Sequence, residues 1–218
     1  SYNSISALKV VGWHPNNNYL LLANEDDEVT IRLDVESGEY TPLNLGIDTS
    51  QMAAPRALAP APNGSGFAFL TYDRATEATQ LYWYDVQTAA ARAVLTLNNK
   101  EGDLEALQVA PDGQQAVFVL HTGSRREGRS EELRLVDLDS GEQQVLLSGP
   151  LGPLQPVWSP DGKQIAYVQR SMDKPLKAGP QVAMPLGDIW TIDVASGELQ
   201  QLTFTQAITR PPVWSPAG

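Results

Sequence analysis

The chain has 218 residues, of which 42% are hydrophobic and 19% are charged, a balance that indicates a packed globular core and excludes a disordered or fibrous chain. It contains no cysteine, which excludes disulfide bonds, thiolate nucleophiles and cysteine-based zinc sites. Its net charge of -11 opposes binding to nucleic acid or to an anionic membrane surface, and no apolar run approaches the roughly 18 residues that span a bilayer.

One motif recurs along the whole chain, in which an apolar run meets a turn built on proline and asparagine, aspartate or glycine and a second apolar run follows. Its copies are VGWHPNNNYLLL at 11–22, APAPNGSGFAFL at 59–70, LQVAPDGQQAVFV at 107–119, PVWSPDGKQIAYV at 156–168 and the truncated PPVWSPAG at 211–218. We call Pro15, Pro62, Pro111, Pro160 and Pro216 the anchor prolines; the intervals between them are 47, 49, 49 and 56 residues. This period fits the four-stranded blade of a β-propeller.

A second motif runs in step with the first and predicts a second hairpin in each unit. Its copies are RLDVESGEYTPL at 32–43, WYDVQTAAARAVL at 83–95, LVDLDSGEQQVLL at 135–147 and TIDVASGELQQLT at 191–203. Three copies turn through Ser-Gly, and the second has alanines at 89–91 instead. We therefore expect the second of these hairpins to be the loosest, or to use a different turn type.

The two hairpins of a unit supply four antiparallel strands, A to D, and no stretch shows a helical period. We predict an all-β fold, a β-propeller with four complete four-stranded antiparallel blades and the first strand of a fifth, as a single domain or fragment over 1–218. The predicted blades are 7–45, 56–97, 105–147 and 154–204, with the extra strand at 208–214. Trp13, Trp158 and Trp214 each stand two residues before an anchor proline, so they should be equivalent and packed between sheets.

The fourth unit carries a family resemblance in WSPDG at 158–162, IAYV at 165–168, DIWTIDVASGE at 188–198 and QQLT at 200–203. These sequence segments resemble the repeats of TolB-like propellers, which are also called PD40 repeats and are related to WD40 blades. The third unit is a good match, whereas the first has WHPNNN in place of WSPDG and the second lacks the tryptophan. The resemblance implies a blade type that also occurs in prolyl-oligopeptidase-like peptidases and tricorn-like proteins, and it favours a periplasmic or extracytoplasmic location.

The fifth unit lacks strands B, C and D after Gly218, and the chain starts SYNSIS without methionine. An open ring would expose blade faces and edges, which natural chains avoid. We therefore expect an excerpt of a longer propeller whose missing blades complete the ring. The alternative is a second copy that fills the gap, as a domain-swapped or side-by-side homo-oligomer.

Residues for catalysis or metal binding are scarce. His14 and His121 are the two histidines, no Gly-x-Ser-x-Gly motif surrounds any serine, and a structural or surface role suits both rings. The acidic run at 25–28 lacks the Asp-x-Asp-x-Asp-Gly spacing and the distal glutamate of a calcium-binding loop, and it is typical of a solvated hairpin. We predict no catalytic residue, metal or cofactor within this chain.

Two insertions between strands B and C are candidates for partner binding, at 121–132 and 170–188. Because they belong to neighbouring blades, we expect them side by side in a rim whose positive charges would favour an acidic partner. The predicted rim residues are Arg125, Arg126, Arg129, Met172, Lys174, Lys177 and Met184. The alternative is a pair of solvated loops in which Glu127, Glu131 and Glu132 neutralise the arginines.

The channel mouth is the other candidate, at the entrance of each innermost strand. Six residues before the anchor prolines stand Lys9, Arg56, Glu105, Leu154 and Arg210. The charged members could bind a small anion or an extended acidic peptide, or they could pair with one another and with water.

Three function classes fit the sequence. The first, which we favour, is a non-enzymatic scaffold that binds a protein or peptide through its B–C loops and channel mouth. The second is the N-terminal gating propeller of a prolyl-oligopeptidase-like serine peptidase whose catalytic domain lies outside this chain. The third is a metal-dependent, carbohydrate-active propeller, which the absence of histidine clusters weakens.

Overall fold

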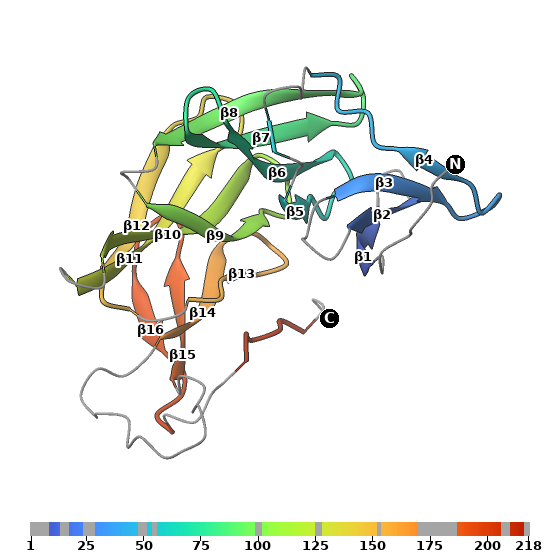
Figure 1. Ribbon diagram of the computed structural model, residues 1–218. Helices are drawn as coiled ribbons and strands as arrows, with labels where there is room; N and C mark the ends of the chain where they lie inside the picture. The colour runs from blue at the N-terminus through green and yellow to red at the C-terminus, as the bar shows by residue number, and fades with distance from the viewer. Residues whose placement is uncertain are drawn as a thin grey trace, which may run out of the picture.

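The computed structural model describes residues 9–13, 18–23, 29–47, 52–53, 56–98, 102–124, 128–151, 154–169, 187–205 and 210–215. These residues form four four-stranded antiparallel sheets and no helix (Figure 1). In each sheet the strands are hydrogen-bonded in chain order, which is the meander of a propeller blade. The prediction of an all-β propeller with four complete blades is confirmed, and the sheets are not closed into a ring.

The blades are numbered in chain order. Blade 1 consists of β1 (Lys9–Trp13), β2 (Tyr19–Ala23), β3 (Val29–Asp34) and β4 (Tyr40–Pro42), and blade 2 of β5 (Arg56–Pro60), β6 (Gly66–Asp73), β7 (Ala78–Asp85) and β8 (Ala90–Asn98). Blade 3 consists of β9 (Asp103–Val109), β10 (Gln115–Ser124), β11 (Gly128–Asp137) and β12 (Gln143–Gly149), and blade 4 of β13 (Val157–Trp158), β14 (Gln164–Gln169), β15 (Asp188–Asp193) and β16 (Leu199–Gln201). The innermost strands β1, β5, β9 and β13 contact one another in that order along the inside of an arc (Figure 1).

The strand expected at 208–214 is not observed over its described part. Residues 210–215 carry no strand, because a strand requires a hydrogen-bonded ladder and no described segment pairs with them. The first strand of a blade pairs only with the second strand of the same blade, so the segment lies beside blade 4 without joining its sheet.

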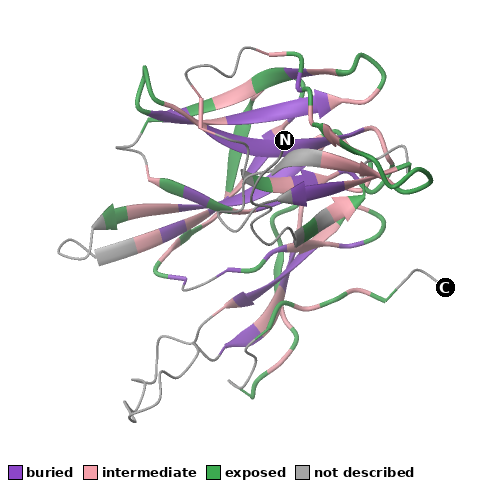
Figure 2. Ribbon diagram, turned by 45° about the vertical axis from the view of Figure 1, so that its right-hand side comes forward, coloured by how far each residue is buried: buried purple, intermediate pink, exposed green. Residues whose placement is uncertain are grey.

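The core lies between the blades, because consecutive residues of the second strands of blades 2, 3 and 4 are buried (Figure 2). In β6, Phe67 and Phe69 pack toward blade 1, whereas Ala68 and Leu70 pack toward blade 3. The side chains of β10 and β14 likewise alternate, and Val117 and Val119 join Ile165 and Tyr167 between blades 3 and 4. Side chains that alternate along a strand thus divide one apolar run between two interfaces.

Aromatic side chains stack within blade 2, in the apolar cluster that blade 2 shares with blade 1. The ring centroids of Phe67 and Tyr84 lie 4.7 Å apart, and those of Phe69 and Tyr82 lie 5.4 Å apart, both in stacked arrangements. Each pair joins neighbouring strands of blade 2, since Phe67 is opposite Tyr84 and Phe69 is opposite Tyr82 in the β6–β7 register. Such cross-strand pairs hold the register that keeps both faces apolar.

Two tryptophans connect the last two units of the chain, blade 4 and the 210–215 segment, to the unit before each. The Trp158 indole Nε1 donates to the Gln108 carbonyl at 3.4 Å, and the Trp214 indole Nε1 donates to the Val157 carbonyl at 3.1 Å. The expected equivalence is therefore seen for these two. Trp13, in contrast, is 52% exposed, since no described blade precedes it.

The hairpins between the third and fourth strands share one turn. In the first, third and fourth blades an aspartate Oδ1 accepts from the backbone N–H and the hydroxyl of the serine three residues later: Asp34 from Ser37, Asp137 from Ser140 and Asp193 from Ser196. The residue after each serine is glycine with a positive φ, of 73° at Gly38, 75° at Gly141 and 72° at Gly197. Glycine suits this left-handed position because it has no Cβ.

Blade 2 keeps the same turn with a different residue. The Asp85 Oδ1 accepts from the Thr88 backbone N–H at 2.8 Å, and Ala89 takes the left-handed position with a φ of 53°. Of the two outcomes expected for this hairpin, a different turn type is thus not observed. The alanine adopts the glycine conformation because the ladder on both sides imposes it, at a cost of roughly 1–2 kcal/mol.

We predict that Ala89→Gly raises the free energy of unfolding by about 0.5–1 kcal/mol, because relief of the left-handed strain exceeds the entropy that glycine adds to the unfolded chain. Urea denaturation measures the difference. Gly197→Ala is the matched control: nothing lies within 4 Å of its added Cβ, so only strain should lower stability. Gly141→Ala should cost more, since its Cβ would lie 2.5 Å from the Val94 carbonyl oxygen. A destabilised Ala89→Gly protein would contradict this account.

The same turns predict acid sensitivity. The serine backbone N–H, followed by the serine hydroxyl, lowers the pKa of Asp34, Asp137 and Asp193 below the ordinary 3.8. Because the folded value is below the unfolded one, this stabilisation is complete above 3.8 and is lost as the pH falls through the lowered values. Asp193→Asn keeps an acceptor oxygen and removes the titration, so its free energy of unfolding should fall less steeply with acid. An unchanged slope in pH-dependent urea denaturation would show that the turn is not responsible.

Candidate functional site

The connections between β10 and β11 and between blades 3 and 4 lie at the same end of blade 3, here called the upper face. The Glu131 Oε2, on β11, accepts a hydrogen bond from the Leu151 backbone N–H at 3.1 Å. Leu151 follows β12 in the connection to blade 4, so one carboxylate joins the two connections. The opposite end, with the tight turns around Gly113 and Asp137, is called the lower face.

His121 lies between two carboxylates on the upper face. Its Nε2 is 3.2 Å from the Glu105 Oε2, and its Nδ1 is 3.7 Å from the Glu131 Oε1. The three residues come from β9, β10 and β11, and the Glu131 side chain is only 10% exposed while that of Glu105 is 67% exposed. A protonated imidazole could donate to both carboxylates, whereas a neutral one donates to one of them. The cluster therefore places one imidazole ring between an exposed and a buried carboxylate.

Strand register brings this cluster together. His121 pairs with Asp103 in the β9–β10 ladder and with Glu131 in the β10–β11 ladder. The β9–β10 ladder shifts register at a bulge, after which Glu105 pairs with Val119. Because Val119 and His121 lie on the same face of β10, Glu105 comes close to the imidazole ring. The sequence predicts Glu105 at the channel mouth and offers Glu131 as a carboxylate that could neutralise the arginines. Spacing alone did not indicate that both would meet His121.

The insertion at 121–132 forms a ribbon rather than a loop over its described part. The β10–β11 ladder continues without a bulge to the pair Ser124 and Gly128. Neither β9 nor β12 pairs with the end of this hairpin, so residues 122–124 and 128–130 extend beyond the blade as two strands (Figure 1). We call these six residues the upper ribbon.

Most of the predicted rim lies outside the described residues. This applies to Arg125, Arg126, Met172, Lys174, Lys177 and Met184, and to the side chain of Arg129, whose backbone pairs with Gly123 in the upper ribbon. The side-by-side placement of 121–132 and 170–188 therefore stays a prediction.

The predicted channel-mouth residues lie on the inner strands or after the last blade. Lys9 and Arg56 begin β1 and β5, with side chains outside the described part of the chain. Glu105 lies near the start of β9, and Leu154 is buried between blades 3 and 4. Arg210 is exposed and belongs to no strand. Of the charged members, only Glu105 thus has a described partner, His121.

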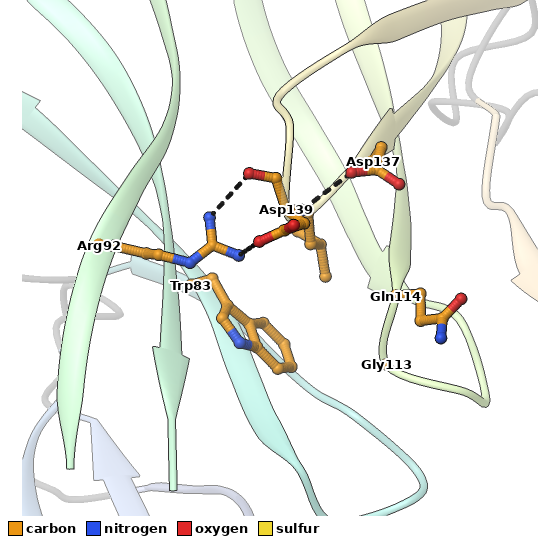
Figure 3. A pocket seen from close by; sticks show the side chains of 7 residues that line it. Trp83, Arg92, Gly113, Gln114, Asp137 and Asp139 are labelled. Carbon is orange, nitrogen blue, oxygen red and sulfur yellow. Dashed lines mark hydrogen bonds and ion pairs between the residues drawn. The ribbon is translucent and has the colours of Figure 1, made fainter. Parts of the chain in front are cut away.

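The lower face holds a cavity of about 410 Å³ between blades 2 and 3 (Figure 3). Its lining residues are Trp83, Arg92, Gly113, Gln114, Asp137, Leu138 and Asp139. The Arg92 guanidinium donates to the Asp139 carbonyl at 3.3 Å and to its carboxylate at 3.2 Å. Both side chains are well exposed, so this pair contributes about 0–1 kcal/mol to stability. Sequence reasoning missed the cavity because two strands of blade 2 and two turns of blade 3, which are distant in the sequence, build it together.

Within the described residues, no group of three or more histidine, aspartate or glutamate side chains is arranged to hold a metal ion. His14 lies outside the described part of the chain. Among the described residues there is also no helix long and apolar enough to cross a membrane.

No family model matches the chain. Among curated proteins, the Tol-Pal system protein TolB of Chromobacterium violaceum is 33% identical over 73 residues, which are 34% of this chain and 14% of that protein. The uncharacterized peptidase YuxL of Bacillus subtilis is 27% identical over 133 residues, or 50% of this chain and 20% of the relative. These matches thus span a fifth or less of the curated relatives.

Solved propellers extend the likeness to most of the chain. TolB from Acinetobacter baumannii has a TM-score of 0.52 at 16% identity, over 91% of this chain and 41% of that one. An oligogalacturonate lyase in complex with manganese gives 0.65 at 15% identity, over 88% and 51%. The propeller domain of the Pyrococcus furiosus trilobed protease, described as having an open velcro topology, gives 0.53 at 15% identity, over 85% and 52%. At these identities the likeness shows the fold, and the chain has the fold of a TolB-like β-propeller.

We predict that Glu131→Ala lowers the free energy of unfolding by about 1–3 kcal/mol, because it leaves the buried Leu151 N–H without its acceptor. Glu131→Gln keeps an acceptor oxygen and should lose less. Glu105→Ala is the control: it removes the exposed carboxylate beside the same histidine and should change stability by about 0.5 kcal/mol or less. Urea denaturation compares the three, and equal losses for Glu131→Ala and Glu105→Ala would refute the role of the buried carboxylate.

Proposed function

We propose that the chain is a non-enzymatic propeller domain that binds a protein or peptide on its upper face. The observation that carries this proposal is the upper ribbon, which extends beyond a rigid, doubly buried blade next to the channel mouth. Binding residues in proteins are commonly presented on connections held by such a scaffold. The lower face, in contrast, is occupied by tight turns that contact the neighbouring blades.

The partner that fits best is acidic. Arg125 and Arg126 lie in sequence between the paired residues Ser124 and Gly128, and Arg129 begins the return strand of the upper ribbon, in a chain of net charge -11. Local positive charge on an acidic protein speeds encounter with an acidic partner more than it holds the complex. Lys174, Lys177, Met172 and Met184 would complete the rim if 170–188 lies beside the ribbon.

The alternative is a gating propeller for a prolyl-oligopeptidase-like serine peptidase whose catalytic domain lies outside this chain. The match to the relative named as a peptidase, which covers 50% of this chain and 20% of that relative, supports it. The relative named as a Tol-Pal system protein supports the binding scaffold instead. A Gly-x-Ser-x-Gly motif in the flanking coding sequence would decide for the peptidase.

The proposal can be tested by measuring the rate at which the chain associates with immobilised peptides of equal length. One set of peptides is rich in aspartate and glutamate, and the other is rich in lysine. The acidic peptides should bind, and the triple change of Arg125, Arg126 and Arg129 to alanine should slow association severalfold at low salt without unfolding the chain. Arg92→Ala, on the lower face, is the matched control and should leave the rate unchanged. Added salt should also slow association.

Three results would overturn the proposal. An association rate that changes neither with salt nor with the triple substitution would exclude the ribbon as the binding site and favour the channel mouth. Turnover of peptide or ester substrates that His121→Ala abolishes would make the chain an enzyme. Stoichiometric metal in the purified protein together with glycan cleavage would favour a carbohydrate-active propeller.

A further inference from the structure

The cavity between blades 2 and 3, here called the lower-face cavity, is lined by polar groups that the fold leaves unused (Figure 3). Arg92 bonds the carbonyl and the carboxylate of Asp139 through its two terminal nitrogens, and its Nε–H donates to no described residue. The Asp137 Oδ1 accepts three hydrogen bonds within its turn, whereas no described group donates to its Oδ2. The exposed side-chain amide of Gln114 likewise has no partner in the described part of the chain. One cavity therefore offers both free donors and free acceptors.

Trp83 and Leu138 supply the apolar part of the lining. Both side chains belong to the core between blades 2 and 3, and Trp83 is only 5% exposed. No described residue accepts a hydrogen bond from the Trp83 indole N–H, although the indoles of Trp158 and Trp214 both bond to carbonyls. Among the described side chains, only the Tyr167 hydroxyl is both fully buried and unpaired, so the Trp83 N–H is not sealed from solvent. A nearly buried side chain of the cavity wall thus keeps an unused donor.

The blade repeat does not by itself require these side chains. Positions in two blades correspond when they lie at the same distance from the turn aspartate or the anchor proline, or opposite such a position in the same ladder. At the interface between blades 3 and 4, four of the seven lining positions carry another kind of side chain: Leu135 in place of Trp83, Gln144 in place of Arg92, Lys163 in place of Gln114 and Ala195 in place of Asp139. Since the blades stack at that interface without these four, packing alone does not explain them.

The mixture of charges in the lower-face cavity selects the class of ligand. A cationic ligand would meet the Arg92 guanidinium, and an anionic ligand would meet the carboxylates of Asp137 and Asp139. A hydroxyl group has one donor and two acceptor positions, so neighbouring hydroxyls can donate to a carboxylate and accept from a guanidinium or an amide. A rigid ring that bears several hydroxyls also has an apolar body that suits Trp83 and Leu138. A neutral sugar has all of these properties.

We propose that the lower-face cavity binds a neutral hexose, free or at the end of a glycan chain, with its hydroxyls bonded to Arg92, Asp137 and Gln114 and its ring against Trp83. The cavity volume of about 410 Å³ lies in the range of small-ligand pockets. This inference does not depend on the proposed function of the upper face, because the two sites share no residue.

Heteronuclear NMR of the folded 218-residue protein tests this with sugars that differ in charge. The probes are glucose, galactose and mannose, each compared with its amino sugar and its uronic acid. At least one neutral hexose should shift the Trp83 indole N–H resonance in a saturable way, with a dissociation constant in the millimolar range. The charged counterparts should bind more weakly, because each brings its charge to a group of the same sign. Trp83→Phe identifies the resonance by its disappearance.

Disaccharides that carry the same hexose at their non-reducing end separate the two sources of the ligand. Binding that is equal or tighter assigns the cavity to the end of a glycan chain. Binding that is lost assigns it to the free sugar.

Variants of the lining separate the cavity from other surfaces. Gln114→Ala should weaken binding of the neutral hexose about three- to tenfold, and Arg92→Ala roughly tenfold or more, since each removes hydrogen bonds to hydroxyls. Gln144→Ala is the matched control, because Gln144 holds the position of Arg92 at the interface between blades 3 and 4, and it should leave binding unchanged. All three side chains are exposed, so the variants should stay folded, which urea denaturation verifies.

The proposal fails if no neutral hexose shifts the indole resonance at tens of millimolar, or if Gln144→Ala weakens binding as much as Arg92→Ala does. Tighter binding of the amino sugars would overturn it in favour of a cation site governed by the carboxylates. Tighter binding of the uronic acids would overturn it in favour of an anion site governed by Arg92. None of these results would affect peptide binding by the upper face, so the two proposals can fail separately.

Discussion

A four-stranded sheet that is apolar on both faces cannot be stable alone, and this constraint organises the whole molecule. The side chains of β6 and β10 alternate between two interfaces, so each central strand contributes to two cores at once. Burial of apolar surface drives this stacking, and an uncovered blade face costs in proportion to its area. The blades therefore form a stack in which every inner member needs both neighbours.

Polar contacts add direction to this apolar stacking. On the lower face, Asn63 donates to the Asp112 carbonyl of the next blade, and Arg92 pairs with Asp139. Near the inner strands, indoles bond to backbone carbonyls of the preceding unit. Such contacts have defined partners, so they set how far one blade is rotated against the next, which burial alone does not specify.

The two faces consequently differ in what they can do. The lower face is built from short turns that contact the neighbouring blade closely: a Cβ at Gly113 would clash with the Ser65 Oγ, and one at Gly141 would lie 2.5 Å from the Val94 carbonyl oxygen. The upper face carries the ribbon between β10 and β11, whose end no other strand pairs with. No described strand outside this hairpin constrains the residues at its end, which suits the upper face for recognition. Likeness of fold to TolB and to peptidase propellers does not by itself choose between these activities.

The turns and the repeat units could be predicted from the sequence alone. The spacing of the anchor prolines and the Asp-x-x-Ser-Gly turns predicted four blades, because turn geometry depends on a few adjacent residues. The likeness of Trp158 and Trp214 was also visible in the repeat. These features need no knowledge of distant parts of the chain.

Only the tertiary structure decided which distant side chains meet. Ladder register brought Glu105 and Glu131 to His121, and it continued the hairpin at 121–132 as paired strands where a loop was expected. The flanking strands imposed the left-handed conformation on Ala89, although alanine does not favour it. The exposure of Trp13 depends on whether a blade precedes it, which its own residues do not encode. Register and inter-blade packing are properties of pairs of distant segments, and for that reason no reading of one segment at a time could predict them.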